Sequence, residues 1–465
     1  MQEEFDYALR QVLSRELPGF RSLLSCKQLT AGASQETYRV VVTTDNGERQ
    51  LALRRSQPTA ASESSVGSIG LVAEARLFQI AGAADIPGPE VIYVLQPDDQ
   101  LGSGFFMEWL EGETLGQRIV RAPEYADVRP RLARQCGEIL ARIHAVDWQA
   151  AGLEKLLPVI RPAQLVDETW AVYRDLNLPV PMIDYTWRWL KENLPAETEL
   201  KLVHGDFRNG NLMVTAAGIN AVLDWELAQI GDPARDLGWL CVNSWRFGQA
   251  QLPVGGFGEV DDLLAGYNSV SATPVSSQQL LFWQVFGSFW WAMATLQMAG
   301  AWRSGETPSL ERPVIGRRSS EAQMDCVNLL IPGHFSVPDT DKALSEGTQL
   351  PMPAELLEGV ARFLKNDVAG QLDTHNGFLA RVAANSLGIA QREFQVGPEL
   401  AEQERQRLES LLQLEGPLDT LRWELVKRLR DGLPLASPGL AEHLRQTVAG
   451  QLVIDQPRYS ALAEH

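Results

Sequence analysis

The chain has 465 residues, of which 45% are hydrophobic and 22% charged, so it is long enough for several folding units and too apolar to be disordered or fibrous. With 41 Lys and Arg against 59 Asp and Glu, its net charge of −18 argues against binding to nucleic acid or to anionic membranes, which needs a basic face. The four cysteines have no metal-ligand spacing, and the acidic start MQEEFDYALR lacks the apolar core of a signal peptide. A cytoplasmic protein with reduced thiols is expected.

The first hundred residues predict a small antiparallel sheet with one inserted helix. Apolar spacing indicates an opening helix over 3–15, and residues 37–55 read as two strands around the turn Asp45-Asn46-Gly47. The inserted helix is expected over 71–81, and two short strands follow in PGPEVIYVL and GFFMEWL.

Helical patterns dominate the rest of the chain. The uncharged stretch 280–302 is long enough to cross a membrane, but it is solitary and is interrupted by Gln284 and Gln297, so a buried helix is expected and no membrane association. A polar stretch with Pro and Gly follows, and beyond it Pro and Gly divide a helical region into about four helices. A homodimer formed through this last region is one arrangement the sequence allows.

The residues that carry chemistry are concentrated in HGDFRNGN, residues 204–211, and in VLDWE, which contains Asp224. The apolar residues KLV lead into the first segment, and NLMV, which starts at Asn211, leads out of it. Asp206 and Asn211 are therefore expected on one short loop between strand ends. Asn211 and Asp224 can then converge as the oxygen ligands that suit Mg²⁺, which leaves Asp206 to orient and deprotonate a hydroxyl. The spacing predicts phosphoryl transfer, and the alternative is a polar turn without chemistry.

These segments, together with GDPARDLGWL at 231–240, closely resemble the aminoglycoside-phosphotransferase family, and within it the kinase-like domains associated with acyl-CoA dehydrogenases. The resemblance implies an α+β, bilobal, protein-kinase-like fold with ATP and Mg²⁺ as cofactors. Its parts would be an antiparallel N-lobe over 1–105, a hinge over 106–112 and a mostly helical C-lobe over 113–332. A linker over 333–350 and an all-α domain over 351–465 would complete the chain.

Further nucleotide-binding residues follow from the kinase pattern. In Leu51-Ala52-Leu53-Arg54, strand alternation puts Ala52 and Arg54 on one face, so Arg54 takes the place of the phosphate-binding Lys. A guanidinium can hold phosphate in a bidentate manner, and Arg55 is the alternative register. Glu74 on the following helix would pair with Arg54, unless it is a surface glutamate.

The nucleotide itself would meet three other segments. Gly32 and Ser34 in TAGASQET could offer backbone N–H groups and a hydroxyl to phosphate, although an ordinary hairpin turn explains them too. The extended backbone from Glu108 to Leu110 could pair with an adenine edge. Ala52 and Met213 would form an apolar slot around the base, and plain core packing is the alternative for Met213.

Three loop residues receive supporting roles. Arg208 is predicted to contact the γ-phosphate, with a solvated loop arginine as the alternative. His204 is predicted to brace the loop, since Asp206 is the better base. Asp236 is expected to hold the same loop from a helix start.

The predicted function is an ATP- and Mg²⁺-dependent transfer of the γ-phosphate to a hydroxyl of a small molecule. GDPARDLG begins only seven residues after Asp224, too soon for the activation loop of a protein kinase. The acceptor region is rich in aromatic and basic side chains, which suits an apolar or anionic substrate such as a hydroxy acid or a hydroxyacyl-CoA. The residues are Trp239, Trp245, Trp283, Trp290, Trp291, Trp302, Arg303, Arg317 and Arg318. A weakly catalytic nucleotide-binding pseudokinase or scaffold, and an aminoglycoside kinase, are the alternatives.

Overall fold

The computed structural model describes residues 2–31, 36–56, 69–196, 199–305, 309–340 and 352–463. Contacts within the chain define two compact units. The first comprises Met1–Arg161, Glu197–Cys241 and Trp245–Trp283, and the second comprises Pro162–Ala196, Val242–Ser244 and Gln284–His465. The domain limits expected from the sequence stay predictions.

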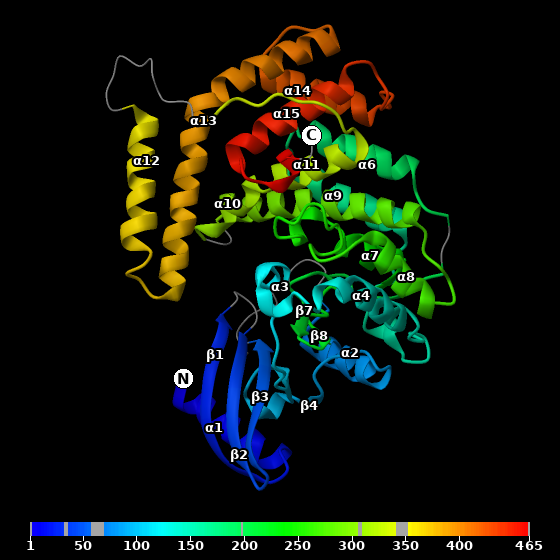
Figure 1. Cartoon of the computed structure of the whole chain (residues 1–465), viewed down its shortest axis with the longest axis vertical. Coiled ribbons are helices and arrows are strands. Elements are labelled where there is room, and N and C mark those ends of the chain that lie inside the picture. The colour runs from blue at the N-terminus through cyan, green and yellow to red at the C-terminus, as the bar shows by residue number, and fades with distance from the viewer. Residues whose placement is uncertain are drawn as a thin grey trace. The chain divides into compact units, whose positions relative to one another are not determined.

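The first unit begins with a five-stranded antiparallel sheet in the order β1-β2-β3-β5-β4 (Figure 1). Helix α1 packs on this sheet, because its apolar face, which includes Leu9 and Leu13, is buried with Val40 and Leu51 of the strands. The predicted hairpin is confirmed, since Thr44 pairs with Gly47 across the turn and Gly47 has a positive φ of 103°. The elements are α1 (Gln2–Glu16), β1 (Phe20–Ala31), β2 (Glu36–Thr44), β3 (Gly47–Ser56), α2 (Leu71–Ala83), β4 (Val91–Val94) and β5 (Ser103–Glu108).

Helices and two short strand pairs complete this unit. Strand β6 pairs with β9 and β7 pairs with β8, so the segment 204–211 forms the loop between β6 and β7. Helix α4 packs against α8. The elements are α3 (Gly116–Arg121), α4 (Arg129–His144), β6 (Lys201–Val203), β7 (Leu212–Thr215), β8 (Gly218–Val222), β9 (Gln229–Gly231), α7 (Ala234–Leu240) and α8 (Val260–Val270).

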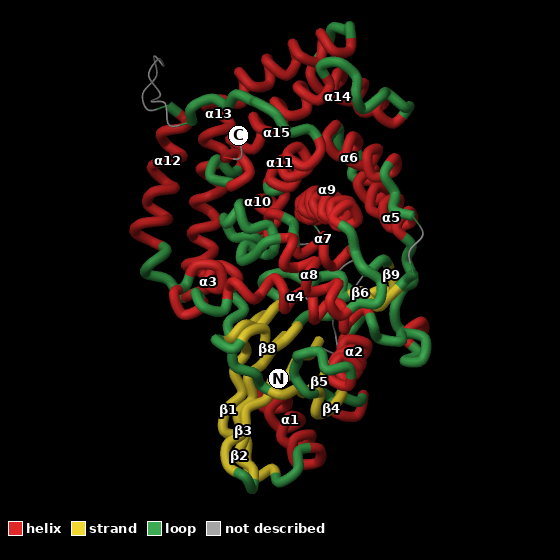
Figure 2. The backbone as a smooth tube through the Cα atoms, turned by 45° about the vertical axis from the view of Figure 1, so that its right-hand side comes forward, coloured by secondary structure: helices red, strands yellow, loops and turns green. Residues whose placement is uncertain are grey.

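The second unit is helical in its described residues (Figure 2). Its core joins Met182 of α6 and Met324 of α11 to Leu408, Leu425 and Leu452 of the last helices. The elements are α5 (Pro162–Asp175), α6 (Pro181–Glu192), α9 (Ser277–Arg303, whose first turns belong to the first unit), α10 (Glu311–Arg317), α11 (Ser319–Leu330), α12 (Pro353–Phe363), α13 (Thr374–Leu412), α14 (Leu418–Arg430) and α15 (Leu440–Asp455).

The predicted α+β class is confirmed, as are the four helices near the C-terminus. The uncharged stretch 280–302 lies within α9 and buries residues such as Phe286 and Phe289, as expected. Among the described residues, no helix has the length and apolarity that a membrane crossing requires. Pro398 lies inside α13 without ending it, while Asp373 caps its first turn by accepting a hydrogen bond from the Asn376 N–H.

Candidate active site

The loop between β6 and β7 is held by a buried carboxylate on α7. Asp236 accepts hydrogen bonds from the backbone N–H groups of His204, at 2.8 Å, and Gly205, at 2.9 Å. His144 Nε2 lies 3.1 Å from the same carboxylate. Burial opposes ionisation, but these contacts outweigh it and keep the pKa of Asp236 below its usual range. Asp236 therefore holds the loop from the start of α7, where the sequence predicts it.

Replacing Gly205 by alanine is expected to destabilise the first unit by several kcal/mol. Gly205 has φ +82°, and a Cβ there would overlap the carbonyl oxygen of Leu227. Gly82→Ala is the matched control, because Gly82 lies in α2 and no heavy atom of the described residues comes within 4 Å of a Cβ there. Thermal unfolding followed by circular dichroism should show a large fall in midpoint for the first variant only. Equal midpoints would contradict the tight fit of this loop.

Asp206 is buried, with 7% of its surface exposed, and both its carboxylate oxygens accept hydrogen bonds. Oδ1 accepts from Trp239 Nε1 at 2.8 Å, and Oδ2 accepts from Asn211 Nδ2 at 2.6 Å. Burial raises the pKa of Asp206, and the nearby Arg208 opposes that shift. The carboxylate is thus oriented by fixed donors, and its raised pKa favours uptake of a proton.

Trp239 is the contact that sequence reasoning missed, since it was assigned only to the acceptor region. The sequence spacing could have predicted this contact, because Trp239 follows Asp236 by three residues on α7 and so lies on the same face of that helix. A helix residue in this position can reach the loop that Asp236 holds.

Asn211 and Asp224 are brought together by strands β7 and β8. The backbone N–H of Leu223 donates to the Asn211 carbonyl at 2.9 Å, which places Asp224 beside the loop. Asn211 commits its amide nitrogen to Asp206, so its amide oxygen is the remaining donor for a metal. Asp224 has φ +66°, a conformation that is uncommon outside glycine and frequent at functional sites.

These two oxygen donors fit Mg²⁺, which binds few protein carboxylates and takes its other ligands from water and phosphate. Among the described residues, no group of three or more His, Cys, Asp or Glu side chains could hold a metal ion. Asn211 and Asp224 would therefore hold the ion together with the phosphates of a nucleotide.

Arg54 connects this metal site to α2. Its Nη2 lies 2.7 Å from Asp224 Oδ1, and its Nε lies 3.1 Å from Glu74 Oε2, close enough for an ion pair but not aligned as a hydrogen bond. Arg55 points to another set of partners, pairing with Glu36 and lying over the Phe5 ring. The register expected from strand alternation thus brings Arg54, Glu74 and Asp224 together.

Glu74→Gln is expected to change how stability depends on pH. Burial raises the pKa of Glu74 to about 7 against the usual 4.5, and Arg54 opposes the shift. The folded protein therefore retains a proton that the unfolded chain loses, so wild-type stability falls as pH rises between these values, by about 3 kcal/mol at most. The variant should gain in thermal midpoint relative to wild type between about pH 5 and pH 8.

The control for this experiment is Glu48→Gln, an exposed residue of β3. The difference in thermal midpoint between Glu48→Gln and wild type should stay constant over the same pH range. A constant difference in thermal midpoint for Glu74→Gln as well would contradict the raised pKa. It would mean that Glu74 is ionised over the whole range, because its attraction to Arg54 outweighs the cost of burying the charge.

The predicted adenine slot lies where β5 ends. Ala52 is buried and pairs in register with Met107, and Glu108 is the last residue of β5. Leu110 follows in the connection to Gly112, whose Cβ would overlap Met213 Cγ. This close approach brings Met213 beside the connection. Gly32 and Ser34, which were expected to cover the phosphates, lie outside the described residues.

Arg208 and His204 both contact Asp206 in this structure. Arg208 Nε lies 2.9 Å from Asp206 Oδ1, and its guanidinium lies over the Trp245 ring at 4.6 Å. His204 Nδ1 accepts the backbone N–H of Asp206 at 3.2 Å, and burial lowers the pKa of the imidazole. His204 therefore supports the loop, while the γ-phosphate contact of Arg208 stays a prediction.

The expected acceptor lining is divided between the two units. Trp239 and Trp245 contact the loop, and Trp283 is buried in the first unit. Arg317 and Arg318 belong to the second unit and pair there with carboxylates, which the sequence did not indicate. The role of this set in acceptor binding stays a prediction.

Comparison with known proteins identifies the class of this site. The model of the phosphotransferase enzyme family, APH, matches residues 25–272, which is 248 of 465 residues. The chain belongs to this family, whose members are enzymes that transfer phosphate to hydroxyl groups of small molecules. A second model, for a domain of unknown function, matches residues 370–459.

A solved structure supports the predicted kinase-like fold. A protein from Ralstonia eutropha assigned as an aminoglycoside phosphotransferase is 21% identical, with a TM-score of 0.55 over 69% of this chain and 96% of that chain. The predicted fold class and family resemblance are both confirmed.

Two curated relatives show the predicted similarity to dehydrogenase-associated domains. Mouse acyl-CoA dehydrogenase family member 10 is 30% identical over 252 residues, which cover 52% of this chain and 22% of the relative. Chicken acyl-CoA dehydrogenase family member 11 is 29% identical over 272 residues, which cover 56% of this chain and 33% of the relative. The chain therefore spans a third or less of the length of these two relatives.

Proposed function

We propose that the chain is an ATP- and Mg²⁺-dependent phosphotransferase in which Asp206 is the general base. The observation that carries the proposal is the convergence of Asp206, Asn211 and Asp224 with the Arg54–Glu74 pair in one partly buried site. A positioned carboxylate, two oxygen ligands and a paired cation are the parts that phosphoryl transfer requires.

In this reaction ATP would supply the phosphoryl group, and Mg²⁺ held by Asn211 and Asp224 would neutralise charge on the phosphate oxygens. Asp206 would accept the proton of the acceptor hydroxyl, whose oxygen bonds to the γ-phosphorus as the bond to the β,γ-bridging oxygen breaks and ADP leaves. Arg208 would give up its contact with Asp206 and turn to the transferred phosphate. Arg54, held by Glu74, would hold the remaining phosphates.

For the acceptor we propose a hydroxy acid or a hydroxyacyl-CoA. The support is the similarity to members of the acyl-CoA dehydrogenase family, together with Trp239 and Trp245 beside the loop. Aminoglycosides are polycations and would need carboxylates in place of those tryptophans. A screen of the three compound classes for ATP-dependent phosphate incorporation tests this choice, and turnover of aminoglycosides alone would overturn it.

A weakly catalytic nucleotide-binding module is the second candidate. Arg54 favours it, because a guanidinium bonded to Asp224 competes with the metal for that carboxylate. The two candidates differ in product formation, since a module would bind ATP without transferring phosphate to any acceptor of the screen.

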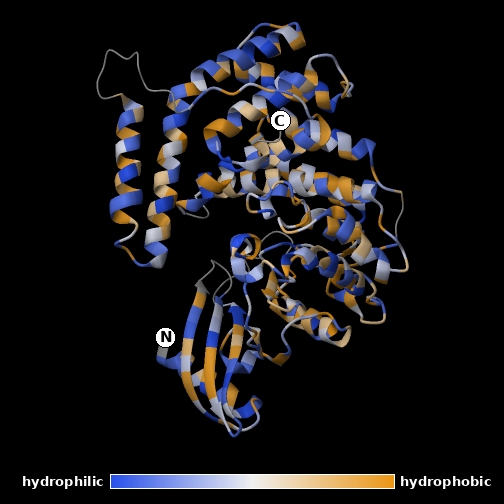
Figure 3. Cartoon of the chain, in the orientation of Figure 1, coloured by the Kyte–Doolittle hydropathy of each residue, from blue (hydrophilic) through white to orange (hydrophobic). Residues whose placement is uncertain are grey.

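We also propose that helices of the second unit mediate a homodimer. Apolar and polar residues alternate along α12 (Figure 3). One face of this helix exposes Leu356, Val360 and Phe363, and Phe394 of α13 is 65% exposed. The double variant Leu356→Lys, Phe363→Lys should convert a dimer to a monomer in light scattering, with the helical circular dichroism unchanged. A wild-type protein that is monomeric at high concentration would overturn this proposal.

A further inference from the structure

The second unit contains a pocket of about 250 Å³ that shares no residue with the loop, metal and nucleotide residues of the candidate active site, and only Arg317 with the expected acceptor lining. Its walls come from helices α9, α10, α11, α13, α14 and α15 and from the segment that begins α6. Most of its lining surface is apolar, with side chains that include Met182, Leu296, Leu444 and Val448. This volume equals that of about eight water molecules in the liquid.

His443 of α15 is the polar group in this pocket that lacks a partner. Its surface is 2% exposed, and neither ring nitrogen has a hydrogen-bond partner within the described residues. Burial, with the positive charges of Arg407 and Arg422, lowers the pKa of His443 to about 3. The ring is therefore neutral and offers one N–H donor and one acceptor. Because buried polar atoms are almost always paired, the ring N–H calls for an acceptor and the other ring nitrogen calls for a donor.

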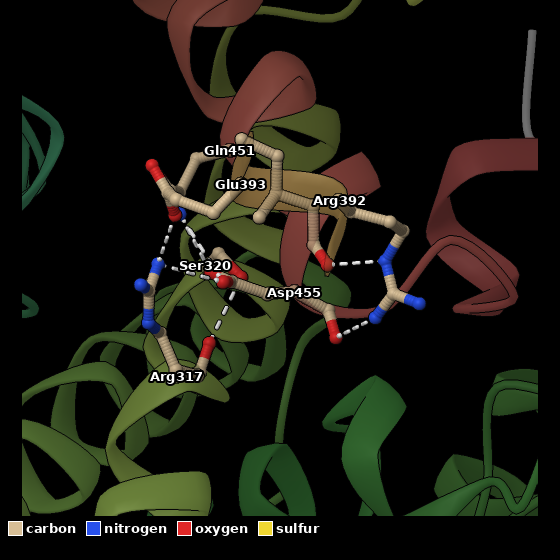
Figure 4. A network of polar contacts seen from close by, with 7 residues as sticks. Arg317, Ser320, Arg392, Glu393, Gln451 and Asp455 are labelled. Atoms are coloured by element: carbon tan, nitrogen blue, oxygen red, sulfur yellow. Dashed lines mark hydrogen bonds and ion pairs between the residues drawn. The ribbon is translucent and has the colours of Figure 1, made fainter. Parts of the chain in front are cut away.

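The charged side chains of the pocket are already paired with one another. Arg422 holds Glu404 through two hydrogen bonds, at 2.8 and 2.6 Å. Arg317 lies 3.1 Å from Asp455, to which Gln451 Nε2 also donates, and 3.0 Å from Glu393 (Figure 4). Because each cation has its carboxylate, a charged ligand would enter without a free counter-charge and would lose its hydration.

We propose that this pocket binds a small, uncharged organic molecule with a hydroxyl or carboxamide group, which hydrogen-bonds to His443 while its apolar part contacts Leu296, Leu444 and Val448. Such a group can accept from the ring N–H or donate to the other ring nitrogen, so it can pair with whichever nitrogen faces it. The proposal is independent of the phosphotransferase reaction, because none of the loop, metal or nucleotide residues of that site takes part.

The test is histidine-selective NMR on the full chain, with ring-labelled histidine and three uncharged probes: cyclohexanol, benzyl alcohol and benzamide. At least one probe should shift the ring resonances of a single histidine, and His443→Leu should abolish that shift. His375→Leu, which removes an exposed histidine of α13, is the matched control and should leave the shift unchanged. Cyclohexanecarboxylate and cyclohexylamine should bind roughly tenfold more weakly than cyclohexanol.

A cavity-filling variant keeps the test independent of His443 itself. Val448→Trp should abolish probe binding while the His443 resonance remains visible and the circular dichroism unchanged. Three outcomes would overturn the proposal: no shift with any of the three uncharged probes, a shift that persists in His443→Leu, or tighter binding of a charged probe than of cyclohexanol.

Discussion

Replacing Asp206 by asparagine is expected to lower kcat by about 10²- to 10⁴-fold while nucleotide affinity stays within a few-fold of wild type. The amide has nearly the same shape but cannot take the proton of the acceptor. Asp206 is not one of the expected metal ligands, so binding of ATP should be preserved. Phosphate incorporation into the acceptor measures the first effect, and calorimetric titration with ATP and Mg²⁺ measures the second.

Asp262→Asn is the matched control, because Asp262 is an exposed aspartate in the first turn of α8. It should have wild-type activity. If wild type and Asp206→Asn transfer phosphate equally fast, Asp206 is not the base. If both bind ATP and neither forms product with any acceptor, the chain is a nucleotide-binding module.

Trp239→Phe keeps the Asp206 carboxylate but removes one of its hydrogen bonds, so its effect on activity should be smaller than that of Asp206→Asn. Its indole donates to Asp206 Oδ1, and this hydrogen bond lowers the pKa of Asp206. Losing it should raise that pKa, so the rise of kcat/KM with pH should move to higher pH, because the base must be ionised. A merely structural role for Trp239 would lower activity at every pH without moving the profile.

The parts of this site that the sequence predicts are local or lie on regular elements. Asp206, Asn211 and Asp224 fall within nineteen residues of chain, so short strands and one turn fix their spacing. Arg54 is predicted by strand alternation, which any strand imposes on its side chains. For these residues, the chain's own geometry determines which way the functional group points.

Contacts between distant helices are what the sequence does not predict. Arg317 looked like a free cation in an aromatic region, yet it pairs with Asp455, 138 residues further along the chain. His443 has no distinctive neighbours in sequence, and only the packing of α13, α14 and α15 around it makes its isolation visible. Such pairings depend on how helices pack, which apolar periodicity alone leaves open.

The second large effect is expected for Asp224→Asn, which should remove most of the Mg²⁺-dependent gain in ATP affinity and lower kcat by at least about 10²-fold. Asparagine tolerates the left-handed conformation at φ +66°, so the backbone is preserved while the carboxylate charge is lost. Titration of ATP with and without Mg²⁺ gives the ratio of affinities that reports on the metal site.

Asp224 also binds Arg54, so the metal effect must be separated from the loss of this ion pair. Arg54→Gln removes the pair but keeps Asn211 and Asp224. It should weaken ATP binding by a similar factor with and without Mg²⁺, because a phosphate contact is lost and the metal ligands are not. A selective loss of the Mg²⁺ effect in Asp224→Asn alone would assign the metal to this carboxylate. Equal behaviour of the two variants would mean that Asp224 acts only by holding Arg54.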